Sequence, residues 1–88
     1  MIPINIVNDD SGDLFVTVTD NNTRPPAAVL SNRRINENDS VPVQVQEDGN
    51  DRGNISWTAT RADDPDRTRT DSETPPANDS VRVTTFGA

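Results

Sequence analysis

The chain of 88 residues contains no cysteine and no histidine, and these absences exclude several kinds of site. Without cysteine there is no disulfide framework to support a small core. Without histidine the usual general base is missing, and a zinc site would have to consist of carboxylates alone. Lysine and tyrosine are also absent, which leaves Asp, Glu, Ser, Thr and Arg for catalytic roles. We therefore expect a protein that is not an enzyme and that needs no cofactor.

Apolar residues are scarce as well. Only 30% of the residues are hydrophobic, and the aromatic residues are Phe15, Trp57 and Phe86. A single domain of this size has a marginal core. Association would stabilise it, and open strand edges pair readily with other chains. The thin core therefore predicts a homo-oligomer.

The charge is strongly acidic, with eight arginines against fifteen acidic residues and a net charge of -7. Such a surface repels phosphate backbones, so we expect no nucleic acid as a partner. The apolar runs are too short for a membrane span. The first residues lack the basic and apolar segments of a signal peptide, which indicates a cytoplasmic chain or one whose leader has been removed. Localisation stays open.

An imperfect tandem repeat of about 40 residues is the clearest pattern that is present. Residues 2–20 match residues 41–61 once two extra residues are allowed in the second loop. The first copy covers about 2–40, the second about 41–80, and a partial third covers 81–88. Both complete copies contain Pro-Pro-Ala, at 25–27 and 75–77, and Asn-Asp-Ser-Val, at 38–41 and 78–81. We expect one domain over residues 1–88.

The repeated segments alternate between apolar and polar residues, which predicts half-buried strands. Thr17, Thr19, Thr58 and Thr60 fall on the face opposite the core, where threonine packs well on a solvated sheet. Phe15 interrupts that face and would be exposed. The inward positions are Ile2, Ile4, Ile6, Leu14, Val16, Val18, Val41, Val43, Val45, Ile55, Trp57, Ala59, Val81 and Val83.

The loops at 8–13 and 47–54 are rich in Gly, Asn and Asp and separate two alternating runs, which predicts a β-hairpin at the start of each copy. Residues 28–35 contain enough apolar side chains for one more strand. Residues 63–78 do not, so we expect them to be mobile or extended. The pattern predicts an all-β antiparallel sandwich or small open barrel of five to seven strands, with a parallel β-helix as the weaker alternative.

The two predicted hairpin loops carry the candidate metal ligands. Calcium prefers oxygen ligands on flexible loops, so two equivalent loops could form two equivalent sites. The alternative is ordinary turn chemistry, since neither loop has the spacing of an EF-hand. The residues are Asp9, Asp10 and Asp13 in the first loop and Asp48, Asn50 and Asp51 in the second.

Five residues are candidates for binding an organic ligand. Phe15 is the better aromatic candidate for stacking on a sugar ring, because the repeat places Trp57 at the inward position of Val16. Arg33 and Arg34, beside Asn36, could clamp a carboxylate or sulfate, although a pair of arginines in an acidic protein more often serves simple charge balance.

These residues favour a non-enzymatic, lectin-like binding module that recognises carbohydrate or another polar ligand through its loops or its Thr/Asn/Asp face. The alternative is a structural or self-assembling protein that associates through strand edges.

Overall fold

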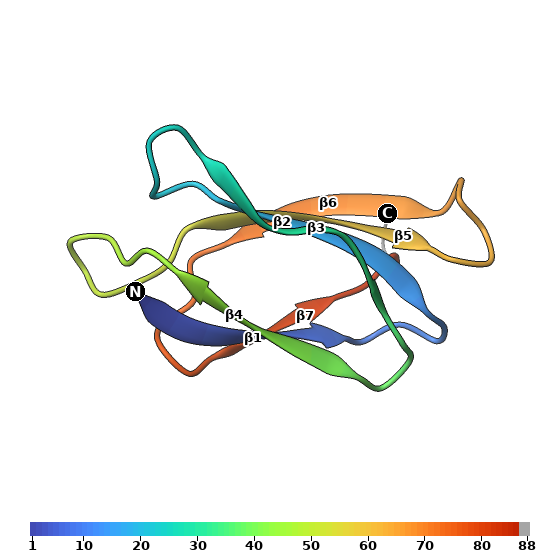
Figure 1. Cartoon of the computed structure of the whole chain (residues 1–88). Helices are drawn as coiled ribbons and strands as arrows, with labels where there is room; N and C mark the ends of the chain where they lie inside the picture. The colour runs from blue at the N-terminus through green and yellow to red at the C-terminus, as the bar shows by residue number, and fades with distance from the viewer. Residues whose placement is uncertain (87–88) are drawn as a thin grey trace.

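The structure is a computed structural model that describes residues 1–86. These residues form seven strands and no helix, so none of them could cross a membrane as a helix (Figure 1). The strands are β1 (Ile2–Asn8), β2 (Leu14–Asp20), β3 (Ala27–Ile35), β4 (Ser40–Val45), β5 (Ile55–Arg61), β6 (Thr68–Glu73) and β7 (Ser80–Val83).

Two sheets pack face to face, with strand orders β4-β1-β7 and β3-β2-β5-β6. We call them sheet A and sheet B. All neighbouring strands are antiparallel except β1 and β7, which are parallel. The predicted all-β fold is confirmed, in its sandwich form.

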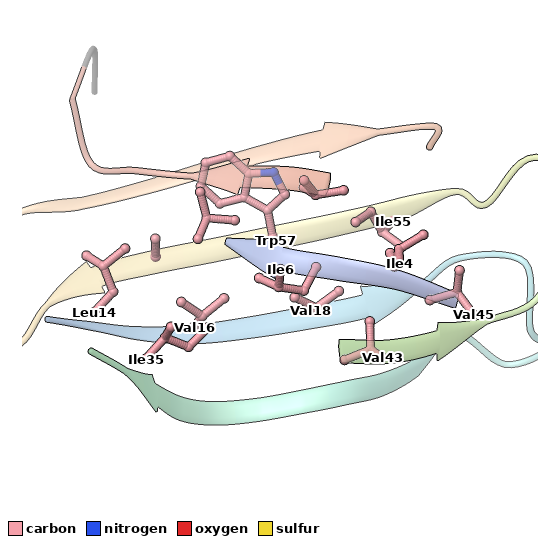
Figure 2. Close-up of a cluster of buried hydrophobic side chains, with 13 residues drawn as sticks. Ile4, Ile6, Leu14, Val16, Val18, Ile35, Val43, Val45, Ile55 and Trp57 are labelled. Carbon is pink, nitrogen blue, oxygen red and sulfur yellow. The ribbon is translucent and has the colours of Figure 1, made fainter. Parts of the chain in front are cut away.

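The core lies between the inner faces of the sheets and consists mainly of branched aliphatic side chains (Figure 2). Trp57 is its aromatic member and is 2% exposed. Every position that the sequence pattern assigned inward lies in this core or, like Ile2 and Val41, packs against it. The buried core residues are Ile4, Ile6, Leu14, Val16, Val18, Ile35, Val43, Val45, Ile55, Trp57, Ala59, Val81 and Val83.

The loops at 8–13 and 47–54 do not close hairpins, so that prediction is wrong. β1 belongs to sheet A and β2 to sheet B, and the first loop therefore carries the chain from one sheet to the other. The second loop does the same between β4 and β5. Two alternating strands joined by a polar loop bury the same apolar faces in a hairpin or across a sandwich, so the pattern alone cannot distinguish the two.

Of the two alternatives predicted for residues 63–78, mobile or extended, the structure agrees with the second, because β6 is a regular strand within that segment. Its side chains are polar, yet its backbone pairs with β5 along its length. Arg69 lies over the ring of Trp57, with its guanidinium carbon 5.8 Å from the ring centroid. Backbone pairing and threonine side chains stabilise this strand without apolar residues of its own. The additional strand predicted over 28–35 is confirmed by β3.

The strand order is compatible with a duplication, which stays a prediction. If β1, β2 and β3 are exchanged with β4, β5 and β6, the strand order of sheet B stays the same, read from its other edge. The two copies also pair with each other in both sheets, β1 with β4 and β2 with β5. β7 supplies the strand of the partial third copy, whose last two residues, 87 and 88, lie outside the described part of the chain.

The two Asn-Asp-Ser-Val segments form the same turn. Asn38 and Asn78 have φ of 63° and 66°, a left-handed conformation that asparagine tolerates better than most residues. In each turn the N–H of the following Asp donates to the carbonyl three residues earlier, that of Asn36 or of Pro76. The Pro-Pro-Ala segments are not equivalent, since the first leads directly into β3, which begins at Ala27, and the second follows β6.

Replacing Trp57 with alanine is expected to destabilise the domain by about 3–5 kcal/mol, because it removes the largest side chain of a thin core. Urea unfolding followed by circular dichroism measures this. Gln44→Ala, on the exposed face of β4, is the control and should change the unfolding free energy by less than about 0.5 kcal/mol. Equal effects of the two changes would contradict the placement of Trp57.

Candidate binding site

The outer face of sheet B presents an ordered set of hydroxyl groups. The registers of β2, β5 and β6 align their outward residues in rows across the three strands. We call these positions the hydroxyl rows. The first row is Phe15, Thr60 and Thr68, the second is Thr17, Thr58 and Thr70, and the third is Thr19, Ser56 and Ser72.

Hydrogen bonds orient several of these hydroxyls. Thr58 and Thr70 lie with their hydroxyl oxygens 3.0 Å apart, and so do Thr60 and Thr68. Thr68 donates its hydroxyl hydrogen to the carbonyl of Ala59, so Thr60 must donate to Thr68. Thr60 and Thr68 therefore offer only acceptor lone pairs to a ligand.

Two other hydroxyls keep their hydrogens. Thr17 accepts from the backbone N–H of Asn32, and Ser56 accepts from the side-chain amide of Asn21. Because each hydroxyl has one hydrogen and two lone pairs, both can still donate. The face thus presents donors and acceptors at fixed places.

A depression of about 350 Å³ lies at one end of this face. Asp13 precedes β2 on the same side as Phe15 and Thr17, since side chains alternate along a strand. The depression therefore lies next to Phe15, in line with the outward-facing side chains of β2. Its lining residues are Asp13, Arg34, Ala62 and Asp63.

Phe15 and Arg34 form the corner between the depression and the hydroxyl rows. They are cross-strand partners, and the guanidinium carbon of Arg34 lies 5.7 Å from the centroid of the Phe15 ring. Arg34 also donates to Asp13 at 2.7 Å, and the N–H of Glu37 donates to the other oxygen of that carboxylate. The bond from Arg34 lowers the pKa of Asp13 most, so this carboxyl is ionised at neutral pH.

The opposite wall contains a second ion pair. The guanidinium of Arg61 donates to both oxygens of Asp63, at 3.0 and 2.9 Å. The hydrogen bond to Arg61 is the main cause that lowers the pKa of Asp63. Both carboxylates of the depression are therefore ionised and each is held by an arginine.

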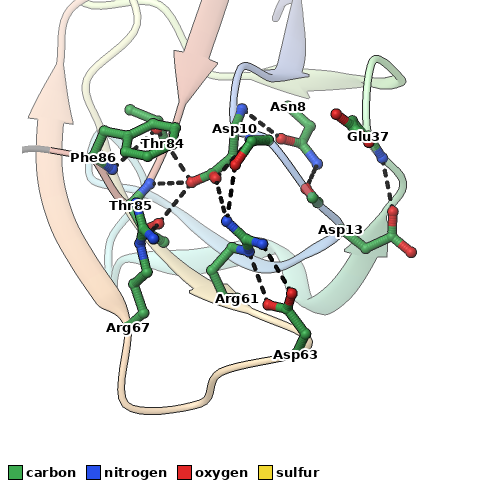
Figure 3. A network of polar contacts seen from close by, with 12 residues as sticks. Asn8, Asp10, Asp13, Glu37, Arg61, Asp63, Arg67, Thr84, Thr85 and Phe86 are labelled. Carbon is green, nitrogen blue, oxygen red and sulfur yellow. Dashed lines mark hydrogen bonds and ion pairs between the residues drawn. The ribbon is translucent and has the colours of Figure 1, made fainter.

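Arg61 also ties the depression to the buried Asp10 (Figure 3). It donates to one oxygen of Asp10 at 3.0 Å, and the Asp10 side chain is fully buried. The other oxygen accepts from the hydroxyl and N–H of Thr85, both at 2.7 Å, and from the hydroxyl of Thr84. Gly12 leaves room for this guanidinium, because a Cβ there would lie 2.7 Å from a nitrogen of Arg61.

Burial opposes ionisation of Asp10 and alone would raise its pKa. Hydrogen bonds from Thr85, from the N–H of Ser11 and from Thr84 outweigh burial and lower the pKa to about 2. Asp10 therefore holds the residues after β7 against the loop between β1 and β2. Its role is to join the first and last parts of the chain.

The candidate calcium ligands are not brought together. Asp9 is exposed, Asp10 bonds to Arg61 and Thr85, and Asp13 bonds to Arg34. In the second loop Asp48 accepts from the N–H groups of Asn50 and Arg52, which is turn chemistry. Asp51, with φ of 60°, occupies the same turn. Within residues 1–86 no group of three or more acidic side chains is arranged to hold a metal ion.

The structure does not bring the five candidates for ligand binding together in one place. Phe15 and Arg34 meet at the corner described above, with Phe15 half-buried instead of fully exposed. Arg33 pairs with Val16 in the register and so alternates to the other side of β3, which means that the two arginines do not act as one clamp. Asn36 is exposed and directly follows β3, and Trp57 is in the core.

Sequence reasoning missed the contribution of β6. Thr68, Thr70 and Ser72 alternate with charged residues, and this period of two was the available signal. No pattern near either residue in the sequence predicts that Asp63 and Asp13 line the same depression, because their positions depend on the pairing of β2 with β5.

No family model matches the chain, and neither a curated protein nor a solved structure matches it.

Replacing Asp10 with asparagine is expected to reduce the unfolding free energy at pH 7 by about 2–4 kcal/mol, since it removes a buried charge from five donors. Asp66→Asn removes the same charge from an exposed loop and should cost less than about 0.5 kcal/mol. Urea unfolding measures both.

Acid should remove the advantage of Asp10. Its folded pKa of about 2 lies below the ordinary value of 3.8, so it stabilises the fold above pH 3.8 and loses this effect as the pH falls towards 2. The shift corresponds to about 2 kcal/mol. The stability difference between the wild type and Asp10→Asn should shrink over that interval, and a constant difference would contradict the assignment.

Proposed function

We propose that this protein is a non-enzymatic binding module that recognises carbohydrate through the outer face of sheet B. One observation carries the proposal. A depression lined by two carboxylates and an arginine opens beside Phe15, at the end of the hydroxyl rows. The sequence contributed Phe15 and Arg34 to this site, and the pairing of strands added the rest.

The chemistry of the corner suits a sugar ring. A pyranose has apolar C–H groups on its faces and hydroxyls around its rim. The ring of Phe15 offers a small apolar platform. Asp13 and Asp63 accept hydrogen bonds and Arg34 donates them. A sugar hydroxyl can therefore donate to one neighbouring group and accept from another.

The ionised carboxylates of the depression argue against glycoside hydrolysis. That reaction needs one carboxyl group that is protonated at the working pH. The pKa of Asp13 and that of Asp63 are both lowered by their arginines. Neither can serve as the general acid at neutral pH, which supports binding without catalysis.

The alternative of self-assembly through strand edges has less support, because each edge strand carries a feature that disfavours pairing. β3 is bulged, with Asn32 at a φ of 50°, and β7 is only four residues long. On the inner face of β6, Arg69, Asp71 and Glu73 occupy alternate positions.

Pro42 protects the remaining edge, on β4. It is the partner of Asn5, whose N–H points to the opposite neighbour and donates to the carbonyl of Asp79. In an antiparallel pair, the backbone N–H and C=O groups of two partner residues point either towards each other or both away from each other. Because those of Asn5 point away from β4, the backbone nitrogen of Pro42 lies on the open side of β4, where proline has no N–H to donate. A strand from another chain would lack this donor.

Phe15→Ala and Arg34→Ala are each expected to weaken glycan binding about tenfold or more, because they remove the platform and the donor at the corner. A glycan array identifies the bound sugars, and calorimetry with the best one measures the dissociation constant. Gln44→Ala, on sheet A, is the control and should bind as the wild type does. An array on which the folded protein retains no glycan would refute the proposed function.

The protected edges predict a monomer instead of the homo-oligomer that composition favours. Light scattering should give a mass near 9.6 kDa, unchanged as the protein is concentrated. Growth to larger species with concentration would restore the self-assembly alternative.

A further inference from the structure

The hydroxyl rows extend well beyond the depression, and this extent bears on the size of the ligand. Outward residues on one strand repeat every ~6.7 Å, and neighbouring strands lie ~4.8 Å apart. Three rows therefore cover about 13 Å along β2 and β5 from the corner at Phe15. This length exceeds that of a single sugar ring.

The charge of the face bears on the kind of ligand. The nine positions of the rows are eight Thr or Ser residues and Phe15. The chain as a whole has a net charge of -7, and 26% of its residues are charged. An anionic polymer would be repelled by the acidic surroundings, whereas an uncharged one meets hydroxyls and the Phe15 ring along the rows.

The arrangement of donors and acceptors changes from row to row. Thr60 and Thr68 in the first row offer acceptors, whereas Thr17 in the second and Ser56 in the third can donate. A polymer of sugars carries hydroxyls that both donate and accept at a regular spacing. A protein partner would instead need apolar anchors at the centre of its interface, and the rows contain one aromatic residue at a corner.

We propose that the ligand is a neutral, extended polysaccharide that lies along β2 and β5, with one end in the depression and successive sugars over the three hydroxyl rows. This inference rests on the proposed function and specifies it. The depression, with Phe15 and Arg34, binds one sugar. The hydroxyl rows then bind the sugars that follow, and affinity grows with chain length because one ligand engages several sites.

The test uses the intact chain and neutral β-1,4-linked oligosaccharides of glucose, mannose, xylose and N-acetylglucosamine, each from one to six sugars. Calorimetry should show affinity for at least one series rising about tenfold or more from one sugar to four. Polygalacturonate oligomers of the same lengths are the anionic comparison and should bind more weakly.

A double variant separates the rows from the depression. Thr17→Val with Thr58→Val keeps β-branched side chains on the strands and removes two hydroxyls from the second row. It should bind a single sugar as the wild type does and lose most of the gain with length. Thr74→Val, an exposed threonine outside the rows, is the matched control. Circular dichroism and urea unfolding establish that each variant is folded.

The outcomes separate this inference from the proposed function. If single sugars and hexamers bind equally well, or if the anionic series binds best, the extended neutral ligand is refuted while carbohydrate binding stands. If the double variant keeps the full gain with length, the assignment to the hydroxyl rows is refuted. If no glycan of any class binds, both proposals fail.

Discussion

The structure depends on the contact between the inner faces of its two sheets. Thirteen buried hydrophobic residues form that contact, and Ile2, Val29, Leu30 and Val41 pack against it, so few large apolar side chains remain for any other surface. Because most of the large apolar side chains are used between the sheets, the outer faces are mainly polar. On sheet B the polar residues are mainly threonine and serine, which suit a strand and carry no charge. The candidate binding surface is thus polar because the apolar side chains are used in the core.

Buried polar groups close the two ends of this core. At one end Asp10 accepts bonds from Arg61 and Thr85, and Asn8 donates to the carbonyls of Gly12 and Ile35. At the other end Asp20, fully buried, accepts from the N–H of Gln46. These bonds satisfy backbone groups where the chain passes from sheet to sheet. They also show that the carboxylates of Asp10 and Asp20 accept their hydrogen bonds from the protein itself.

The same end bonds shape the proposed site. Arg61 holds both the buried Asp10 and the exposed Asp63, so the wall of the depression is anchored to the core. Arg34 is fixed between the Phe15 ring and Asp13. A binding group that is already oriented loses little conformational entropy when a ligand arrives. Weak individual contacts with sugars can then contribute to useful affinity.

Local alternation of apolar and polar residues determined that β1, β2, β4, β5 and β7 are strands and which of their faces is buried. It placed Trp57 in the core and Thr17 and Thr58 outside, because the period of two depends only on the pleat of a strand. The Asn-Asp-Ser-Val turns were likewise set by the tolerance of asparagine for a left-handed conformation.

Tertiary structure alone decided which strands are neighbours. A loop such as 8–13 can return within one sheet or cross to the other with the same faces buried, so the sequence could not exclude a hairpin. The crossing brings Asp10 to Arg61, and the pairing of β5 with β6 adds Thr68 and Thr70 to the outer face. The candidate site combines residues from β2, β3, β5 and β6, and contacts between segments so distant in the chain leave no periodic signal in any one of them.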